Sequence, residues 1–166
     1  MGLFSKLFGG KAEAINPNHI YAPMAGEAVA ITEVPDPTFA EGLLGNGIAI
    51  KPTSGKVCAP FNGTVETMFD TGHAVALTSE SGVELLIHVG LETVGLNGAP
   101  FQVKVKNGQK VKKGDILMIA DLDAIQAAGL PTITPVVVCN TDDYPTLNTT
   151  IGKTVGNGDV VIEVGK

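Results

Sequence analysis

Two of the three histidines in the chain, His73 and His88, stand where they could act together. Histidine is the side chain that most often supplies nucleophilic, proton-transfer or metal chemistry near neutral pH. Residues 82–90 alternate between aliphatic side chains at the odd positions and Glu84, Leu86 and His88 at the even ones. This pattern predicts a strand that carries His88 on the face opposite its aliphatic residues.

A second strand is predicted over residues 73–78, joined to the first through a hairpin loop at 79–82. If the loop is symmetric and holds two or four residues, Thr78 faces Val83 and His73 faces His88. The two Cβ atoms would then lie about 4.5 to 5.5 Å apart on one face. A loop of odd length, or a bulge, would shift the register and remove this pairing.

Three interpretations of such a pair stay open on spacing alone. The first is a pair of half-buried strand histidines without chemistry. The second is a metal site, against which stand the lack of a His-x-His or His-Glu-x-x-His motif and of a neighbouring cysteine. The third is a catalytic pair in which one ring attacks and the other steadies the developing charge. His19 is predicted to be a surface residue, and no serine-hydrolase elbow or nucleotide-binding loop is present.

The composition narrows the class of protein. The chain has 166 residues, a net charge of -6, 44% hydrophobic and 17% charged residues, which fit one folded domain and exclude a disordered chain. The 11 basic residues are all lysines. An acidic chain without arginine is a poor candidate for nucleic-acid binding or for gripping phosphate through bidentate side chains.

The distribution of turn signals predicts an all-β fold. Short apolar or alternating runs are separated by turn dipeptides, and the chain contains 21 Gly and 10 Pro. We expect an antiparallel β-sandwich, or a barrel-sandwich hybrid, with one or two short helical turns at 122–129 and 39–42. Two internal echoes, of 22–29 with 59–65 and of 108–115 with 152–159, predict related hairpins in the two halves.

The domain is predicted to span residues 19–166, after a flexible or amphipathic segment at 1–18. Leu3, Phe4, Leu7 and Phe8 have helical spacing and could form a short anchor at a membrane surface. No apolar run is long enough to cross a bilayer. Cys58 and Cys139 are expected to be buried thiols in a reducing cytoplasm.

The segment around His88, GVELLIHVGLETVGLNG (82–98), resembles the phosphorylation-site segment of the glucose-class enzyme IIA family of the bacterial phosphoenolpyruvate-dependent sugar phosphotransferase system. Further matches are Thr71-Gly-His73, Gly47–Thr53 and Thr134–Val137. The resemblance runs from about residue 20 to the C-terminus. It implies a compact antiparallel β-sandwich that forms a single IIA domain.

The resemblance also implies a phosphotransferase component with a phosphohistidine intermediate, of the EC 2.7.1 type. His88 would accept a phosphoryl group on Nε2 from the carrier HPr and pass it to the IIB domain of a membrane permease for a glucose-class sugar. His73 would hydrogen-bond the phosphoryl group, and Thr71 would orient His73. No cofactor would be required. Zinc would bind His73 and His88 only adventitiously or as a bridge to a partner.

The resemblance places the partner-binding surface around the two rings, in a protein of the cytoplasm or the inner face of the membrane. Its predicted residues are Asp36, Phe39, Leu43, Leu44, Phe69, Leu86, Glu92 and Val94. The apolar members would meet the partner, and Asp36 and Glu92 would face a basic one. Glu92 stands where the family usually has Asp, and Leu86 where enteric members have Phe. These two departures argue against carrying the regulatory partners of the enteric members over to this chain.

Overall fold

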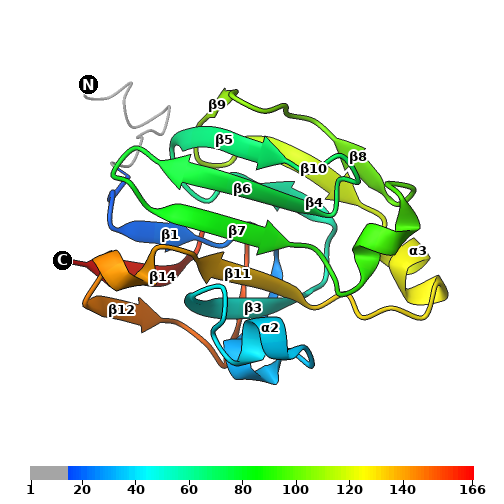
Figure 1. The fold of residues 1–166 in the computed structure, drawn as a ribbon, viewed down its shortest axis with the longest axis horizontal. Helices are drawn as coiled ribbons and strands as arrows, with labels where there is room; N and C mark the ends of the chain where they lie inside the picture. The colour runs from blue at the N-terminus through cyan, green and yellow to red at the C-terminus, as the bar shows by residue number, and fades with distance from the viewer. Residues whose placement is uncertain (1–14) are drawn as a thin grey trace, which may run out of the picture.

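The computed structural model describes residues 15–166, so most of the predicted N-terminal segment lies outside the described residues. Within that range the strands form three antiparallel sheets (Figure 1). The largest has eight strands, in the spatial order β13 (Lys153–Val155), β2 (Gly26–Ala30), β3 (Asn46–Pro52), β11 (Thr134–Val138), β7 (Glu84–His88), β6 (Ala74–Ser79), β5 (Gly63–Met68) and β9 (Lys110–Val111).

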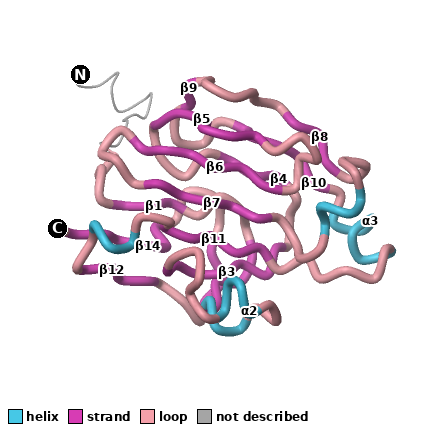
Figure 2. The backbone as a smooth tube through the Cα atoms, in the orientation of Figure 1, coloured by secondary structure: helices cyan, strands magenta, loops and turns pink. Residues whose placement is uncertain are grey.

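The two smaller sheets have three strands each. One has the order β1 (His19–Tyr21), β14 (Val160–Gly165) and β12 (Thr146–Thr149), and the other the order β4 (Lys56–Cys58), β10 (Ile116–Ala120) and β8 (Phe101–Val103). Figure 2 shows how little of the described chain is helical. The predicted β-sandwich class is confirmed, and the sheets do not close into a barrel.

The helical segments are short and lie at the ends of strands. They are α2 (Pro37–Ala40), α3 (Leu122–Ala127) and the 3-10 turns η1 (Ile31–Glu33), η2 (Thr93–Leu96) and η3 (Thr141–Asp143). Asp36 precedes α2 and accepts the Thr38 N–H at 3.0 Å, and Asp121 precedes α3 and accepts the Ala124 N–H at 3.1 Å. These caps satisfy N–H groups that have no partner within the helix, which explains where both helices begin.

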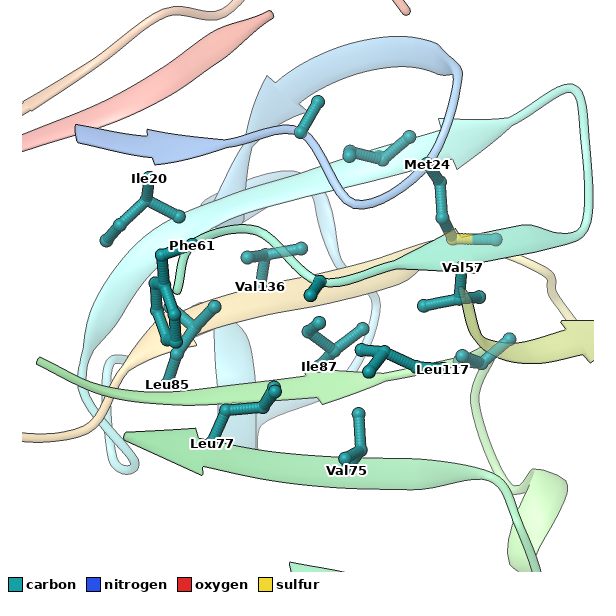
Figure 3. Close-up of a cluster of buried hydrophobic side chains, with 14 of the residues drawn as sticks. Ile20, Met24, Val57, Phe61, Val75, Leu77, Leu85, Ile87, Leu117 and Val136 are labelled. Carbon is teal, nitrogen blue, oxygen red and sulfur yellow. The ribbon is translucent and has the colours of Figure 1, made fainter. Parts of the chain in front are cut away.

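The main core lies on one face of the large sheet (Figure 3). Val75 and Leu77 from β6 and Leu85 and Ile87 from β7 point into it together with Leu117 from β10. This confirms the predicted alternation, because His88 projects from the other face of β7. The aliphatic face therefore anchors the strand while the His88 ring stays free of the core.

A second, smaller apolar cluster covers part of the outer face, beneath η1 and α2. Its buried members are Val29, Val34, Phe39, Ala49, Leu91, Ile133 and Val137, with Leu86 packed against them. The cluster holds the 31–40 segment against the sheet. It thereby brings α2 to the end of β7 where His88 stands.

The two pairs of similar segments, 22–29 with 59–65 and 108–115 with 152–159, form one repeated structural arrangement. The Asp115 carboxylate accepts the Lys112 N–H at 2.9 Å, and the Asp159 carboxylate accepts the Gly156 N–H at 2.8 Å. Both turns are therefore closed by the same hydrogen bond from backbone to side chain. The Asp115 carbonyl then accepts the Ala59 N–H, and the Asp159 carbonyl the Ala22 N–H. Each turn therefore closes on one of the two Ala-Pro segments, which confirms the predicted related hairpins.

The predicted register of the β6–β7 hairpin is wrong by one residue. Ala74, not His73, is the partner of His88, and Thr78 is the partner of Glu84. The loop has three residues, 80–82, and closes on Ser79, which both donates to the Val83 carbonyl and accepts the Val83 N–H on its hydroxyl. Gly82 supplies the positive φ of +100° that this odd-length loop uses.

The prediction for the cysteines is confirmed in part. Cys58 is buried and both thiols are free, but Cys139 is exposed because it follows the last residue of β11, where the chain leaves the sheet toward η3. His19 lies at the start of β1, half-buried, with Nε2 3.4 Å from Glu163. Within residues 15–166 no helix is long and apolar enough to cross a membrane.

Candidate functional site

His88 is the last residue of β7, and the backbone just beyond it fixes its ring. Nδ1 of His88 lies 2.8 Å from the carbonyl oxygen of Gly90. Because a carbonyl oxygen only accepts hydrogen bonds, Nδ1 must be the donor. Gly90 has a φ of +74°, which lets the chain turn back toward the ring. The neutral ring therefore keeps its lone pair on Nε2, the nitrogen that points away from this contact.

His73 lies directly before β6 and meets His88 ring to ring. The ring centroids are 4.9 Å apart with an angle of 79° between the planes. His73 precedes the regular strand and follows Gly72, which has a φ of +72°. The alternation of side chains along β6 therefore does not determine where the His73 ring points. The two rings therefore meet although the two residues are not cross-strand partners.

Two further contacts hold His73. Its Nδ1 lies 2.5 Å from the Thr71 hydroxyl, and its carbonyl accepts the Val89 N–H at 2.7 Å. The side chain is 5% exposed. Thr71 and His73 are thus brought together as predicted, and the backbone contact ties His73 to the residue next to His88.

Phenylalanine rings flank the pair on both sides. The Phe39 ring lies 5.1 Å from that of His88, and the Phe69 ring 5.4 Å from that of His73. The four rings form a row that starts at α2 and ends after β5. Each imidazole therefore lies between a phenylalanine ring and the other imidazole.

Burial keeps both imidazoles neutral. Burial, together with the smaller effect of the neighbouring His88, lowers the pKa of His73 to about 4. Burial also lowers the pKa of His88, against the smaller opposing effects of the Gly90 carbonyl and of the Asp36 and Glu92 carboxylates. Near pH 7 each ring therefore has one protonated and one free nitrogen.

The remaining predicted residues lie on or beside α2 and β7, except Phe69, which follows β5. Asp36 caps α2, and Glu92 stands in the turn before η2 with a φ of 61°. Leu43, Leu44, Phe69 and Val94 are exposed, by 69%, 40%, 38% and 50%. Phe39 is buried and Leu86 half-buried, so these two support the surface rather than form it.

Sequence reasoning did not identify two residues of this region. Gly90 contributes only a carbonyl, and the signal for it is the glycine two positions after a strand-end histidine. Val103 is 41% exposed and lines a hollow together with Phe69. Nothing in the three-residue strand β8 distinguishes Val103 from an ordinary edge residue.

The two histidines alone do not complete a metal site. The two imidazoles could supply two ligands. Among residues 15–166 no group of three or more His, Cys, Asp and Glu side chains is arranged to hold a metal. A tetrahedral zinc site at His73 and His88 would therefore need ligands from outside this part of the chain.

The chain is similar in sequence to a known family of proteins. Residues 18–144 match the family of the phosphoenolpyruvate-dependent sugar phosphotransferase system, EIIA 1. The glucose-specific EIIA component from Bacillus anthracis is 43% identical over 160 residues, which are 96% of either chain, and its counterpart from Bacillus cereus is 42% identical over the same share.

A solved structure is similar as well. The glucose permease IIA from Mycoplasma capricolum superposes with a TM-score of 0.81 at 37% identity, over 87% of this chain and 93% of that one. The family match, over residues 18–144, includes both His73 and His88. The chain therefore belongs to the EIIA 1 family of the phosphoenolpyruvate-dependent sugar phosphotransferase system, whose members are phosphoryl carriers in sugar uptake.

Proposed function

We propose that His88 is the phosphoryl acceptor of this carrier and that the new bond forms at Nε2. The observation that carries the proposal is the hydrogen bond from Nδ1 of His88 to the Gly90 carbonyl, 2.8 Å long. This hydrogen bond keeps the proton of the neutral ring on Nδ1 and leaves the lone pair on Nε2. A ring kept neutral by burial is a competent nucleophile near pH 7.

The phosphoryl transfer requires no additional acid or base. The Nε2 lone pair of His88 forms the new N–P bond while the N–P bond of a phosphohistidine donor breaks. The bonding pair of electrons leaves with the ring nitrogen of the donor, and that ring becomes neutral. The proton on Nδ1 of His88 stays in place, so the positive charge gained by the ring lies beside the Gly90 carbonyl.

His73 would act on the phosphoryl group rather than form a bond to it. If the Thr71 hydroxyl donates to Nδ1 of His73, the neutral ring carries its proton on Nε2 and can donate a hydrogen bond to a phosphoryl oxygen. A donor held in advance where charge develops needs no reorganisation during the transfer. Thr71 would fix both the tautomer and the direction of the His73 ring.

The donor and the acceptor would use the same surface in turn. We assign the donor role to HPr and the acceptor role to a cysteine of a permease IIB domain, and the sugar to the glucose class because both curated relatives are named glucose-specific. The docking surface consists of the exposed Leu43, Leu44, Phe69 and Val94 with the acidic Asp36 and Glu92. Its apolar centre and acidic members fit partners with an apolar patch and basic groups.

The transfer would need neither nucleotide nor metal. The donor is already a phosphohistidine, so the bond that breaks and the bond that forms are of the same kind and no further energy source is required. Phosphoryl transfer of this kind depends mainly on positioning. We therefore expect phosphorylation to continue in the presence of a chelator.

The site of action would be the cytoplasm, with contact to the inner face of the membrane through the first residues. The free thiols of Cys58 and Cys139 fit a reducing compartment. A carrier that serves a membrane permease must also reach the membrane surface. Binding of the full chain and of a chain beginning at residue 15 to anionic lipid vesicles would test the contribution of the first residues.

The central experiment follows phosphate from phosphoenolpyruvate through enzyme I and HPr to this protein. Wild type should gain one acid-labile phosphate, and His88→Ala should gain none. His19→Ala is the matched control, because His19 lies on β1, outside the site, where it pairs with Glu163 of β14. Equal labelling of wild type and His88→Ala would overturn the assignment.

A further inference from the structure

The segment from Val89 to Thr93 must place the Gly90 carbonyl against the His88 ring. A neutral imidazole has two tautomers, and the group that accepts a hydrogen bond from one nitrogen decides which nitrogen stays unprotonated. The Gly90 carbonyl is that group for His88, at 2.8 Å from Nδ1. Anything that rotates the peptide of Gly90 therefore changes which nitrogen is available to react.

Thr93 is the side chain in contact with this peptide segment. Its hydroxyl donates to the Val89 carbonyl at 2.6 Å, and the side chain is 0% exposed. A Cβ atom on Gly90 would lie 2.7 Å from Thr93 Cγ2 and 2.9 Å from the Pro131 carbonyl oxygen. Thr93 thus holds the segment through its hydroxyl at Val89, and its methyl group occupies the space that a side chain at Gly90 would need.

The other contacts fix the two ends of the segment. The Val89 N–H donates to the His73 carbonyl at 2.7 Å, and the Leu91 N–H donates to the Pro131 carbonyl at 3.1 Å. Both are backbone bonds that any residue could make at these positions. The hydroxyl of Thr93 is the contact that depends on the identity of a side chain.

We infer that Thr93 is a positioning residue for phosphoryl transfer: it holds the Val89–Gly90 segment so that the Gly90 carbonyl keeps the proton of His88 on Nδ1 and leaves Nε2 free to react. The inference rests on the proposed function of His88. The need for this contact increases during the reaction, because the phosphorylated ring is positively charged and a carbonyl binds a charged donor more strongly than a neutral one.

Two substitutions separate the roles of the hydroxyl and of the methyl group. Thr93→Val removes the hydroxyl and keeps the shape, whereas Thr93→Ser keeps the hydroxyl and removes the methyl group. Thr141→Val is the control: its hydroxyl also donates to a carbonyl at 2.6 Å, that of Val138, and accepts the Asn46 N–H at 2.9 Å, near the end of β11 that lies away from His88 (Figure 1). It reports the effect of losing a hydrogen-bonded threonine hydroxyl away from the two rings.

The measurements are the 15N NMR signals of the His88 ring nitrogens and the rate of phosphate uptake from phospho-HPr. In wild type Nδ1 should be protonated and Nε2 not. In Thr93→Val the two nitrogens should show mixed protonation and uptake should be about 10-fold slower, the lower end of the loss seen when a group that orients a metal-binding histidine is removed. Thr93→Ser and Thr141→Val should keep the wild-type tautomer and a rate close to that of wild type.

Failure of the inference can be told apart from failure of the proposed function. If wild type is labelled on His88 but Thr93→Val keeps both its tautomer and its rate, Thr93 has no positioning role while the acceptor assignment stands. If wild type is not labelled on His88, the proposed function itself fails. Should Thr93→Val not fold, Thr93→Ala compared with Thr93→Ser isolates the hydroxyl, and an unchanged His88 tautomer and rate in Thr93→Ala would contradict the inference.

Discussion

The His73 and His88 rings lie edge to face, 4.9 Å apart, although His88 pairs across the hairpin with Ala74. The contact depends on the bend before β6, which frees the His73 side chain from the strand alternation. The hydrogen bond from Val89 N–H to the His73 carbonyl joins the bend to the end of β7. The relative position of the rings is thus set by backbone outside both strands.

Replacing His73 with alanine should separate uptake of phosphate from its delivery. His88 keeps its own contact with Gly90, so His73→Ala should still accept one phosphate from phospho-HPr. Transfer to a permease IIB domain should fall by about 10²-fold, the usual effect of removing one donor from a transition state. Stopped-flow transfer assays would measure both steps, and normal delivery by the variant would remove His73 from the mechanism.

The pH dependence of stability should follow the lowered pKa values of the two rings. The folded protein binds protons on His73 only near pH 4, whereas the unfolded chain binds them near 6.5. The unfolded state therefore binds more protons as the pH falls, and the free energy of unfolding should decrease from about pH 6.5 toward pH 4. His88 acts in the same direction.

Denaturant titrations at several pH values would measure this dependence. The carboxylates also titrate in this range, so the informative quantity is the difference between wild type and His73→Phe. Wild type should lose more stability between pH 6.5 and 4 than the variant. Parallel curves for the two proteins would show that His73 is not held neutral by the fold.

The exposed apolar residues around the rings should contribute to binding and not to folding. Leu43→Ser and Val94→Ser should weaken binding of HPr by roughly 10-fold each, since truncating an anchor at an interface costs about 1 to 2 kcal/mol. Ile116→Ser is the matched control, because Ile116 is 41% exposed on β10, in another sheet. Calorimetry would measure the affinity of each variant for HPr. An equal loss of affinity in all three variants would argue against a specific docking surface.

The acidic residues should affect the rate of association more than the rate of dissociation. Glu92→Gln removes a carboxylate close enough to His88 to influence its pKa. The association rate with a basic partner should fall and its dependence on salt should become weaker. Surface plasmon resonance at low and high salt would measure both rates, and an unchanged salt dependence would contradict the assignment of Glu92 to the docking surface.

The sequence predicted the elements of the site better than their register. Alternation over residues 82–90 placed His88 on the correct face, because four aliphatic residues can be buried only on the other one. The register failed because it depends on one loop residue, and Gly82 permits a three-residue loop that the composition of the loop does not reveal. That His73 meets His88 was predicted, but by a pairing that the structure does not contain.

Other features could not be predicted because they are made by backbone or by tertiary contacts. The Gly90 carbonyl has no side-chain signature, and the burial of Phe39 on α2 depends on a second apolar cluster that also includes residues of β2, β3 and β11. The exposure of Cys139 depends on where β11 ends. By contrast, the echoed Gly-Asp turns were visible in the sequence because their lock is a side-chain hydrogen bond.

The position of the phosphoryl group on the ring is the most direct test of the role proposed for His88. Phosphorylated protein labelled with 15N in its histidines would be examined by 31P and 15N NMR, which distinguish the two ring nitrogens. A single phosphoryl group on Nε2 of His88, with Nδ1 protonated and bonded to Gly90, is the result that the geometry predicts. A phosphoryl group on Nδ1 of His88, or on His73 or His19, would contradict it.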